Sequence, residues 1–398
     1  MKKRILVFGA GHNQTLLIRA CKELGYHTVV TDPNTEAPGK ALADHFEVLP
    51  PKDFEAHCEL IERERIQGIV TCQMENPLSL MAKLAQRYEL LFPTTEVIQR
   101  ARNKFLMKQA FLKEGVPCAN GQIIDTSTDL DHLDLDQWQF PLIIKPVDSY
   151  SSRGVYKVNS LAELKERHAE ALRFSSTGQV LIEEFLEGPE VSVEAVTYQG
   201  TTHIIQVTDK VITPYPNTVE LAHYQPSQLE ADQQRSIEQV VCNAIKALGI
   251  DYSGSHAELK LTPQGPKMIE IGARLGGDYI SSYLTTLSTG VDMNRAIAQI
   301  AVGEEPDVTP SCQQYSGIQY VNWPTGRKVK AVASLDPFLQ NPEVAFANIM
   351  VAPGDTLPAV TESTNRHAFF ITSGSSKAEL EQNVQRLSED LSKLLTLD

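Results

Sequence analysis

Two glutamates lie within the stretch SHAELKLTPQGPKMIEIGARLGG, residues 255–277. A loop at residues 262–266 separates two short apolar runs, which predicts a β-hairpin. If the loop is symmetric about Gln264, Glu258 lies directly opposite Glu270 on one face of the hairpin. Facing carboxylates repel each other unless a cation lies between them, and such oxygen ligands suit Mg²⁺. The hairpin therefore predicts a magnesium site, with a solvated acidic hairpin as the alternative.

Arg274 follows the second glutamate by four residues and brings a permanent, fork-shaped cation to the same end of the hairpin. A guanidinium of this kind suits phosphate or carboxylate oxygens. Gly276 and Gly277 come next, and residues without a Cβ let the backbone approach a ligand closely. We expect an anionic ligand to bind at this point of the chain.

The composition excludes several classes of protein. The chain has 398 residues, enough for two or three domains, and 42% of them are hydrophobic and 22% charged. A formal charge of −14 without an offsetting basic run argues against a nucleic-acid-binding surface. The six cysteines have neither metal nor redox spacing, which fits reduced thiols. No signal peptide or membrane span is indicated, so we expect a cytoplasmic protein without a membrane partner.

The first hundred residues alternate apolar runs with helix-like segments, which predicts a doubly wound α/β domain. A glycine turn at residues 9–14 follows the first strand, and Asp32 ends the second. Because Gln14 stands where an NAD-binding fingerprint needs glycine, we favour another use of the crevice. Glu75 follows the carboxyl end of a strand, where open parallel sheets place ligands; an N-cap role for Asn76 explains that stretch equally well.

Two segments of the middle of the chain indicate phosphate binding. A helix expected at residues 95–114 carries Asn103-Lys104. The following strand, residues 141–146, contains Lys145, which is costly in an apolar strand unless it meets an anion. A Ser/Gly loop at residues 147–154 offers backbone N–H groups and hydroxyls to phosphates, although a polar hairpin is the alternative.

Acidic residues surround a strand break in EEFLEGPE, residues 183–190, where a solvated acidic turn is the alternative. Residues 208–226 are expected to form a long irregular stretch before a helix at residues 230–248. Long irregular stretches inside compact domains are usually functional or disordered. Glu220 and His223 lie in this stretch, so they are candidate site residues.

In this order, the features resemble those of the ATP-grasp superfamily over residues 3–305. The resemblance implies an α/β (α+β ATP-grasp) fold with four parts. These are a doubly wound N-terminal domain at residues 1–100, a small lobe with the phosphate loop at 101–178, a large lobe with the metal and substrate sites at 179–305, and a small C-terminal subdomain at 306–398.

The resemblance also implies roles for individual residues. The nucleotide-binding residues are Lys104 and Lys145 for the phosphates, Ser151, Ser152 and Gly154 in the loop over them, Glu183 with the backbone of Glu184 and Leu186 for adenine, and Glu190 for the ribose. Glu258 and Glu270 are the implied magnesium ligands. Gly272 departs from the pattern, because many members have asparagine there, and this puts a third side-chain ligand for a second metal ion in question.

Within the superfamily, the chain most resembles the L-amino-acid (dipeptide-forming) ligases. The resemblance lies in the spacing of Glu220-x-x-His223 ahead of the two implied metal ligands, and of Arg274 and Gly277. This implies Glu75, Glu220, His223 and Arg274 as substrate residues, and Arg274, Lys145 and Gly277 as catalytic ones. The implied reaction uses ATP and Mg²⁺ to activate a small-molecule carboxylate as an acyl phosphate, which an amine then attacks. ADP and phosphate are released.

The sequence leaves the oligomeric state open, although homodimers are common in that family. Three other readings stay open. One is a purine-pathway ATP-grasp enzyme that activates bicarbonate or formate. The others are a non-catalytic nucleotide-binding module and an NAD-dependent enzyme.

Overall fold

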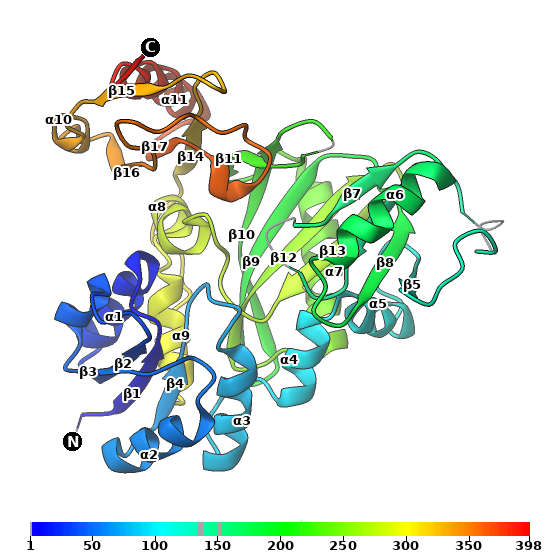
Figure 1. Cartoon of the computed structure of the whole chain (residues 1–398). Coiled ribbons are helices and arrows are strands. Elements are labelled where there is room, and N and C mark those ends of the chain that lie inside the picture. The colour runs from blue at the N-terminus through cyan, green and yellow to red at the C-terminus, as the bar shows by residue number, and fades with distance from the viewer. Residues whose placement is uncertain (1, 134–137, 150–152, 216) are drawn as a thin grey trace.

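The N-terminal part of the chain is a four-stranded parallel sheet with helices on both faces (Figure 1). The computed structural model describes residues 2–133, 138–149, 153–215 and 217–398. The strand order is β3-β2-β1-β4, formed by β1 (Arg4–Phe8), β2 (His27–Asp32), β3 (His45–Val48) and β4 (Gly68–Val70). The connecting helices are α1 (His12–Glu23), η1 (Pro38–Leu42), α2 (Phe54–Glu64) and α3 (Leu78–Tyr88). The predicted doubly wound domain is confirmed.

The crevice of this sheet is filled by protein side chains. The backbone N–H of Ala10 donates to Asp32 Oδ2 over 2.7 Å, so this carboxylate serves the glycine turn itself. Gly9 has a φ of +90°, and a Cβ there would clash with the sulfur of Met74. Pro77, and not Asn76, stands at the start of α3 without any side-chain cap, so the N-cap explanation of that stretch is wrong.

A helical pair leads out of this domain. The single helix expected at residues 95–114 is wrong, because the chain forms α4 (Thr95–Arg102) and α5 (Lys104–Lys113). Asn103 between them is extended, with φ −117° and ψ 109°, and its Oδ1 accepts hydrogen bonds from the N–H groups of Phe105 and Leu106. Asparagine competes with the helix for backbone donors, which explains the break and places Lys104 at the first position of a new helix.

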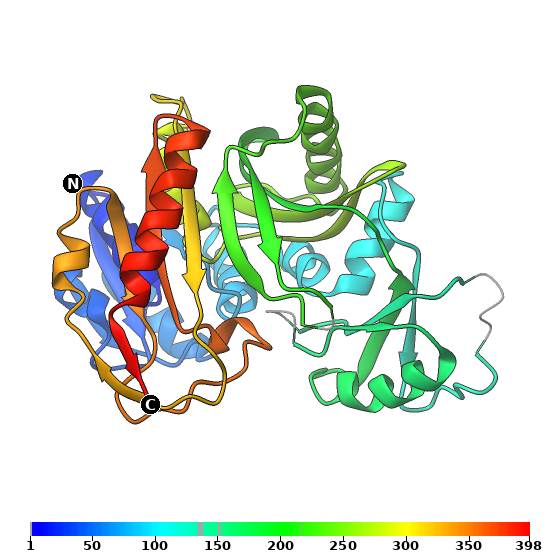
Figure 2. The ribbon, with the colours of Figure 1, turned by 90° about the horizontal axis from the view of Figure 1, so that it is seen from above.

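The small lobe is a four-stranded antiparallel sheet in the order β5-β8-β6-β7. Its strands are β5 (Gly121–Asp125), β6 (Leu142–Pro146), β7 (Tyr156–Val158) and β8 (Gln179–Glu184), and α6 (Leu161–Leu172) covers one face. Figure 2 shows this lobe projecting to one side of the molecule. Ile144, Val158, Leu164 and Ile182 are fully buried in a small core of its own.

The large lobe and the C-terminal part share one eight-stranded antiparallel sheet in the order β13-β12-β9-β10-β11-β14-β17-β16. Its strands are β9 (Glu190–Tyr198), β10 (Thr201–Ile212), β11 (Glu220–Gln225), β12 (Ser253–Thr262), β13 (Gly265–Gly272), β14 (Tyr315–Val321), β16 (Val344–Ile349) and β17 (Ala368–Gly374). The irregular stretch expected at residues 208–226 is therefore wrong. Residues 208–212 end β10 and residues 220–225 form β11, so only residues 213–219 connect two paired strands.

Helices and a second small sheet complete the molecule. The helices are α7 (Ala231–Leu248), the π-helical turn η2 (Ile280–Leu284), α8 (Thr285–Thr289), α9 (Met293–Ala301), α10 (Asp336–Leu339), the 3₁₀ turn η3 (Ser363–Asn365) and α11 (Lys377–Ser392). The strands β15 (Val329–Val332) and β18 (Leu395–Leu397) pair near the C-terminus. Helix α9 packs on α1 and shares a core with the N-terminal sheet, which joins that domain to the large lobe. In the described part of the chain, no helix is both long and apolar enough to span a bilayer.

Candidate active site

Glu258 and Glu270 face each other across the β12–β13 hairpin, as predicted. The hairpin reaches this register through a shorter turn and a bulge, and not through the expected symmetric loop. The turn holds only Pro263 and Gln264, with Thr262 paired to Gly265, and the register shifts by one residue beyond Leu259. This bulge lets two consecutive residues, Ile269 and Glu270, line the cavity, since a regular strand would alternate them.

Each of these carboxylates already has a lysine partner. Lys104 Nζ lies 2.8 Å from Glu270 Oε2, and Lys210 Nζ lies 2.9 Å from Glu258 Oε1. Burial would raise the pKa of the Glu258 carboxyl, but Lys210 and the neighbouring His256 hold it well below its usual value. Burial would likewise raise the pKa of the Glu270 carboxyl, but the neighbouring Lys104 outweighs this effect and lowers it. Both groups are thus carboxylates at neutral pH.

The described residues contain no group of three or more His, Cys, Asp or Glu side chains that could hold a metal ion on their own. A facing carboxylate pair fits Mg²⁺, because this ion commonly takes one or two protein carboxylates and completes its shell with water and phosphate oxygens. Glu258 and Glu270 are therefore the residues that would hold Mg²⁺.

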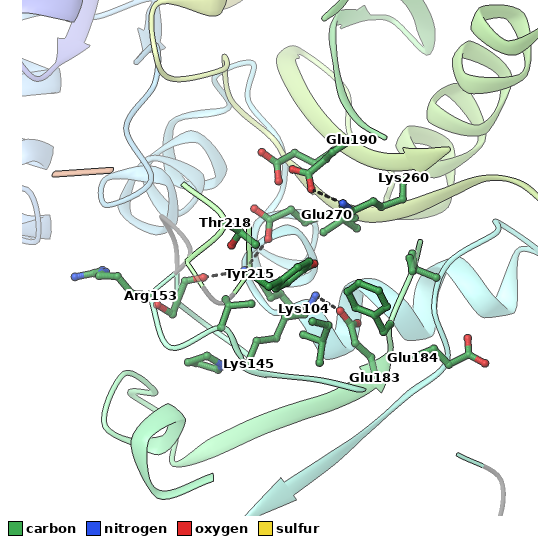
Figure 3. A pocket seen from close by; sticks show the side chains of 18 of the residues that line it. Lys104, Lys145, Arg153, Glu183, Glu184, Glu190, Tyr215, Thr218, Lys260 and Glu270 are labelled. Atoms are coloured by element: carbon green, nitrogen blue, oxygen red, sulfur yellow. Dashed lines mark hydrogen bonds and ion pairs between the residues drawn. The ribbon is translucent and has the colours of Figure 1, made fainter. Parts of the chain in front are cut away.

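A cavity of about 120 Å³ opens above this pair, between the small and large lobes (Figure 3). The side chains of Ile143 and Val155 from the small lobe and Ile269 from the large lobe give it an apolar part, and Phe185 and Leu186 connect the two lobes. The remaining lining is strongly charged. Its charged residues are Lys104, Lys145, Arg153, Glu183, Glu184, Glu190, Lys210, Glu220, Glu258, Lys260 and Glu270.

Lys145 and Glu183 form a buried ion pair at one end of this cavity, and each is less than 10% exposed. A second lysine, Lys108 on α5, lies 3.1 Å from the other carboxylate oxygen of Glu183. Burial would raise the pKa of Glu183, but the two lysines outweigh this effect and lower it. The carboxylate that the resemblance assigned to adenine thus holds Lys145 in place. The sequence reasoning missed Lys108, because a lysine on an amphipathic helix carries no distinguishing pattern.

Glu190 and Lys210 belong to a second charged cluster. Lys210 Nζ lies 2.6 Å from Glu190 Oε1, and Lys260 Nζ lies 3.3 Å from Glu190 Oε2. Burial would lower the pKa of Lys210, but Glu190, Glu258 and Glu220 raise it well above its usual value. Lys210 is 2% exposed and touches three predicted site residues. It was not identified from the sequence, because residues 208–212 were not recognised as a strand.

The predicted phosphate loop begins directly after β6. Lys104 Nζ donates to the backbone oxygen of Ser149 over 2.7 Å, which ties the start of the loop to α5. Gly154 has a φ of +76°, and a Cβ there would press on Phe174 and Pro146. Glycine is thus required where the hairpin turns back into β7. Ser151 and Ser152, predicted to contact phosphates, lie outside the described residues.

A second cavity, of about 350 Å³, adjoins the first and shares Lys210, Glu220, Glu258 and Glu270 with it. The predicted substrate residues Glu75, Glu220, His223 and Arg274, together with Gly277, all line this second cavity. Arg274 Nε donates to Glu75 Oε2 over 3.1 Å, so the N-terminal domain and β13 meet here. The structure therefore brings the two predicted sets of residues, for nucleotide and for substrate, to two sides of one carboxylate pair.

Glu220 and His223 extend from β11 and are held by polar partners. Ser363 Oγ donates to Glu220 Oε2 over 3.0 Å, and His223 Nε2 lies 3.2 Å from Asp278 Oδ2. Arg366 in turn donates to both oxygens of Asp278. Asp278, Ser363 and Arg366 were not predicted, and two of them come from the C-terminal part of the chain.

His256 was also missed. Its Nε2 lies 3.4 Å from Glu258 Oε1, and its Nδ1 is hydrogen-bonded to the fully buried Glu194. Ser281 Oγ and the N–H of Gly276 donate to the other Glu194 oxygen over 2.6 and 3.2 Å. Burial would lower the pKa of His256, but the two carboxylates outweigh this effect and raise it to about 9. His256 stands two residues before Glu258, and this spacing along one strand face was the only available indication.

Comparisons with known proteins agree with this architecture. Residues 1–102 match the ribonucleotide synthetase preATP-grasp domain, residues 138–282 the ATP-grasp domain, and residues 324–392 the L-amino acid ligase C-terminal domain 2. Dapdiamide A synthase of Enterobacter agglomerans is 25% identical over 414 residues, covering 98% of this chain and 96% of that protein.

Two solved structures have the same fold. The L-amino acid ligase from Bacillus licheniformis superposes with a TM-score of 0.83 at 22% identity and covers 100% of this chain and 98% of that one. The phosphoribosylglycinamide synthetase from Anaerococcus prevotii gives 0.78 at 20% identity, with 100% of both chains covered.

The domain order, the fold and the two-cavity site define an ATP-grasp protein. Its C-terminal domain and its relatives further identify it as a member of the ATP-grasp carboxylate–amine ligases, the group that includes L-amino acid ligases. The predicted family and enzyme class are confirmed.

Proposed function

We propose that the protein joins a carboxylate to an amine, with amino acids as substrates, and that it converts ATP to ADP and phosphate. One observation carries this proposal. We call the cavity of about 120 Å³ the nucleotide-side cavity and the cavity of about 350 Å³ the substrate-side cavity. The two cavities meet at Glu258 and Glu270, so a γ-phosphate and a carboxylate substrate would be adjacent. Positioning two anions in line and neutralising their charge is most of what phosphoryl transfer requires.

In the first step, a substrate carboxylate oxygen attacks the γ-phosphorus of ATP, the bond between the γ-phosphorus and the β–γ bridging oxygen breaks, and ADP leaves. Lys145 and Lys104 are placed to hold the phosphates, since both lie in the nucleotide-side cavity. Mg²⁺ bound to Glu258 and Glu270 would withdraw negative charge from the phosphate oxygens.

In the second step, the amine nitrogen bonds to the acyl carbon and the carbon–oxygen bond to phosphate breaks. Arg274 lines the substrate-side cavity and would face the developing oxyanion. His223 lies on the same wall, and its Nδ1 has no hydrogen-bond partner among the described residues, so it is the candidate acceptor of the amine proton.

A purine-pathway ATP-grasp enzyme is the second candidate, because the phosphoribosylglycinamide synthetase structure has the same fold. The charge of the substrate-side cavity argues against a phosphate-bearing sugar. Among the described residues, five acidic side chains line this cavity, against Lys210, Arg274 and His256, whose pKa is raised to about 9. An amino acid, with its ammonium group, is a better match for acidic walls.

A phosphate-release screen of amino acids, singly and in pairs, with Mg·ATP tests the proposal. Release that requires two substrates and yields ADP supports it. With an ¹⁸O-labelled carboxylate substrate, one label should appear in the released phosphate. AMP and pyrophosphate as products, or release that depends on bicarbonate or formate, would contradict it.

A further inference from the structure

The turn that follows β13 forms one wall of the substrate-side cavity and has an unfavourable backbone. Gly277, Asp278 and Ile280 line this cavity. Asp278 and Tyr279 have φ values of +48° and +60°, in the left-handed region that residues with a Cβ rarely adopt. The π-helical turn η2 begins directly afterwards, and such wide turns occur frequently at functional sites. A turn of this kind persists only where its surroundings hold it.

The C-terminal domain supplies the contacts that hold the turn. Arg366 follows η3, and its Nη1 and Nη2 donate to the two oxygens of Asp278 over 2.7 and 2.9 Å. Arg366 is 7% exposed and lies 3.7 Å from the ring centre of Tyr320 on β14. The side chain of Tyr279 packs on Phe346 and Phe369, from β16 and β17. Both strained residues are thus held by the C-terminal domain.

The same contacts extend to the predicted substrate residues. Asp278 also meets His223, and Arg366 Nη1 donates to the backbone oxygen of Glu220 over 3.3 Å. Ser363, whose backbone oxygen accepts from Arg366 Nε, donates its hydroxyl to the Glu220 carboxylate. Arg366 lines neither of the two cavities, so it acts through these neighbours and not on a ligand.

We propose that Arg366 is a positioning residue through which the C-terminal domain sets the geometry of the substrate-side wall, at Asp278, His223 and Glu220. For its effect on catalysis, this inference rests on the proposed ligase function. Lys104 pairs with Glu270 and Lys145 with Glu183, all on other elements. The network approaches the nucleotide-side cavity through Glu220, whose Oε1 lies 3.7 Å from Lys210 Nζ. Loss of Arg366 should therefore change the handling of the amino-acid substrate and leave nucleotide binding nearly unchanged.

The first test needs no substrate. Hydrogen exchange of the full-length protein is compared for wild type, Arg366→Gln, Arg366→Lys and the control Arg327→Gln, which removes an exposed ion pair with Asp398 in the same domain. Arg366→Gln should raise exchange in residues 277–284 by about tenfold or more, since a buried bidentate charge pair is lost. Exchange in β12 and β13 should stay unchanged, Arg366→Lys should show a smaller rise, and the control none.

The second test uses kinetics with the substrate pair found in the phosphate-release screen. Arg366→Gln should raise the KM for an amino acid by about tenfold, with the dissociation constant for Mg·ADP within about twofold of wild type. Asp278→Asn, which keeps the shape but removes the charge, should follow the same pattern and replaces Arg366→Gln if that variant does not fold.

Unchanged exchange at residues 277–284, or an equal loss of nucleotide and amino-acid binding, would overturn the inference. A wild-type protein without pair-dependent phosphate release would contradict the proposed function instead, and the exchange experiment would still decide the role of Arg366.

Discussion

At the residue scale, the site is organised by lysines that pair with its carboxylates. Lys104 pairs with Glu270, Lys210 with Glu258, and Lys145 with Glu183. Buried carboxylates would otherwise carry a large desolvation cost. The same lysines can turn to phosphate oxygens when the nucleotide enters. These ion pairs gather the charges that the proposed catalysis would need.

The residues that could be predicted from the sequence are those whose neighbours along the chain reveal them. Glu258 and Glu270 lie opposite each other in one hairpin, and Arg274 follows two residues after that hairpin ends. Arg366 could not be predicted, because it meets Asp278 across 88 positions of sequence. His256 and Lys108 likewise gain their meaning only from partners that folding brings close.

The metal pair gives the first prediction. Glu270→Gln should lower turnover by about a hundredfold or more, because a neutral amide weakens Mg²⁺ binding and leaves Lys104 without its partner. The fold should be retained, as judged by thermal unfolding. Glu381→Gln, at an exposed position of α11, is the matched control. Wild-type phosphate release by Glu270→Gln would contradict the assignment of the metal site.

The second prediction concerns Lys145. Lys145→Ala should raise the KM for ATP and lower kcat, by about tenfold or more together, since its charge would act on the ground state and on the leaving phosphate. Steady-state kinetics at varied ATP measures both constants. Lys165→Ala on the exposed face of α6 serves as the control within the same lobe. An effect on the KM for the amino acid alone would place Lys145 outside the nucleotide site.

At the element scale, the strand and helix types were largely predictable and their ends were not. The apolar runs of the N-terminal sheet and of β6 predict strands that the structure contains. The end of β10 was missed because it carries the charged Lys210, which lines a charged cavity, so the segment lacks the apolar pattern of a strand. The β12–β13 bulge was missed for another reason: loop length alone does not reveal a shift in register.

A glycine at the bend before β9 gives the third prediction. Gly188 has a φ of +134°, and a Cβ there would overlap the backbone oxygen of Leu261 on β12. Gly188→Ala should therefore displace the segment that carries Glu190 and lower the melting temperature. Gly200→Ala is the control, since its φ is +74° but its Cβ would meet open space.

The control should cost about 1 kcal/mol from backbone strain alone, which corresponds to roughly 1 °C in the melting temperature of a chain of this length. Gly188→Ala should cost clearly more and should also weaken ADP binding. Equal losses in the two variants, measured by thermal unfolding, would show that the close approach to β12 has no energetic weight.

At the scale of the whole molecule, three parts of the chain converge on the junction of the two cavities. The N-terminal domain contributes Glu75, the lobes contribute the lysines and the metal pair, and the C-terminal domain contributes Ser363. The shared sheet from β13 to β16 makes the C-terminal domain continuous with the large lobe. Ligands bound at this junction should consequently stabilise the molecule as one unit.

Linkage between metal and nucleotide is the fourth prediction. Mg²⁺ alone must compete with Lys104 and Lys210 for the carboxylates, so it should bind weakly without a nucleotide. Phosphates that attract the lysines should strengthen Mg²⁺ binding, and the effect must be reciprocal. Calorimetry and thermal unfolding with Mg²⁺, ADP, or both measure this linkage.

Mg·ADP at a hundredfold excess over its Kd should raise the free energy of unfolding by about 2.7 kcal/mol. Equal Mg²⁺ affinity with and without ADP would contradict the linkage.

The polarity of the substrate-side cavity leads to the last prediction. Fifteen of the described residues line this cavity, and among them only Met74 and Ile280 have apolar side chains. Burying a leucine or phenylalanine side chain against apolar walls gains about 1.5–3 kcal/mol, and these walls do not offer that gain. Because 1.4 kcal/mol corresponds to a factor of ten, small or polar amino acids should exceed leucine and phenylalanine in kcat/KM by about tenfold or more.

Kinetics over a panel of amino acids measures this preference. A variant with Gln73→Leu and Asn76→Leu, which makes the same wall apolar, should shift the preference toward leucine without changing the KM for ATP. Efficient use of phenylalanine or leucine by the wild-type protein would mean that substrate side chains bind outside this cavity, since its lining offers them no apolar contact beyond Met74 and Ile280.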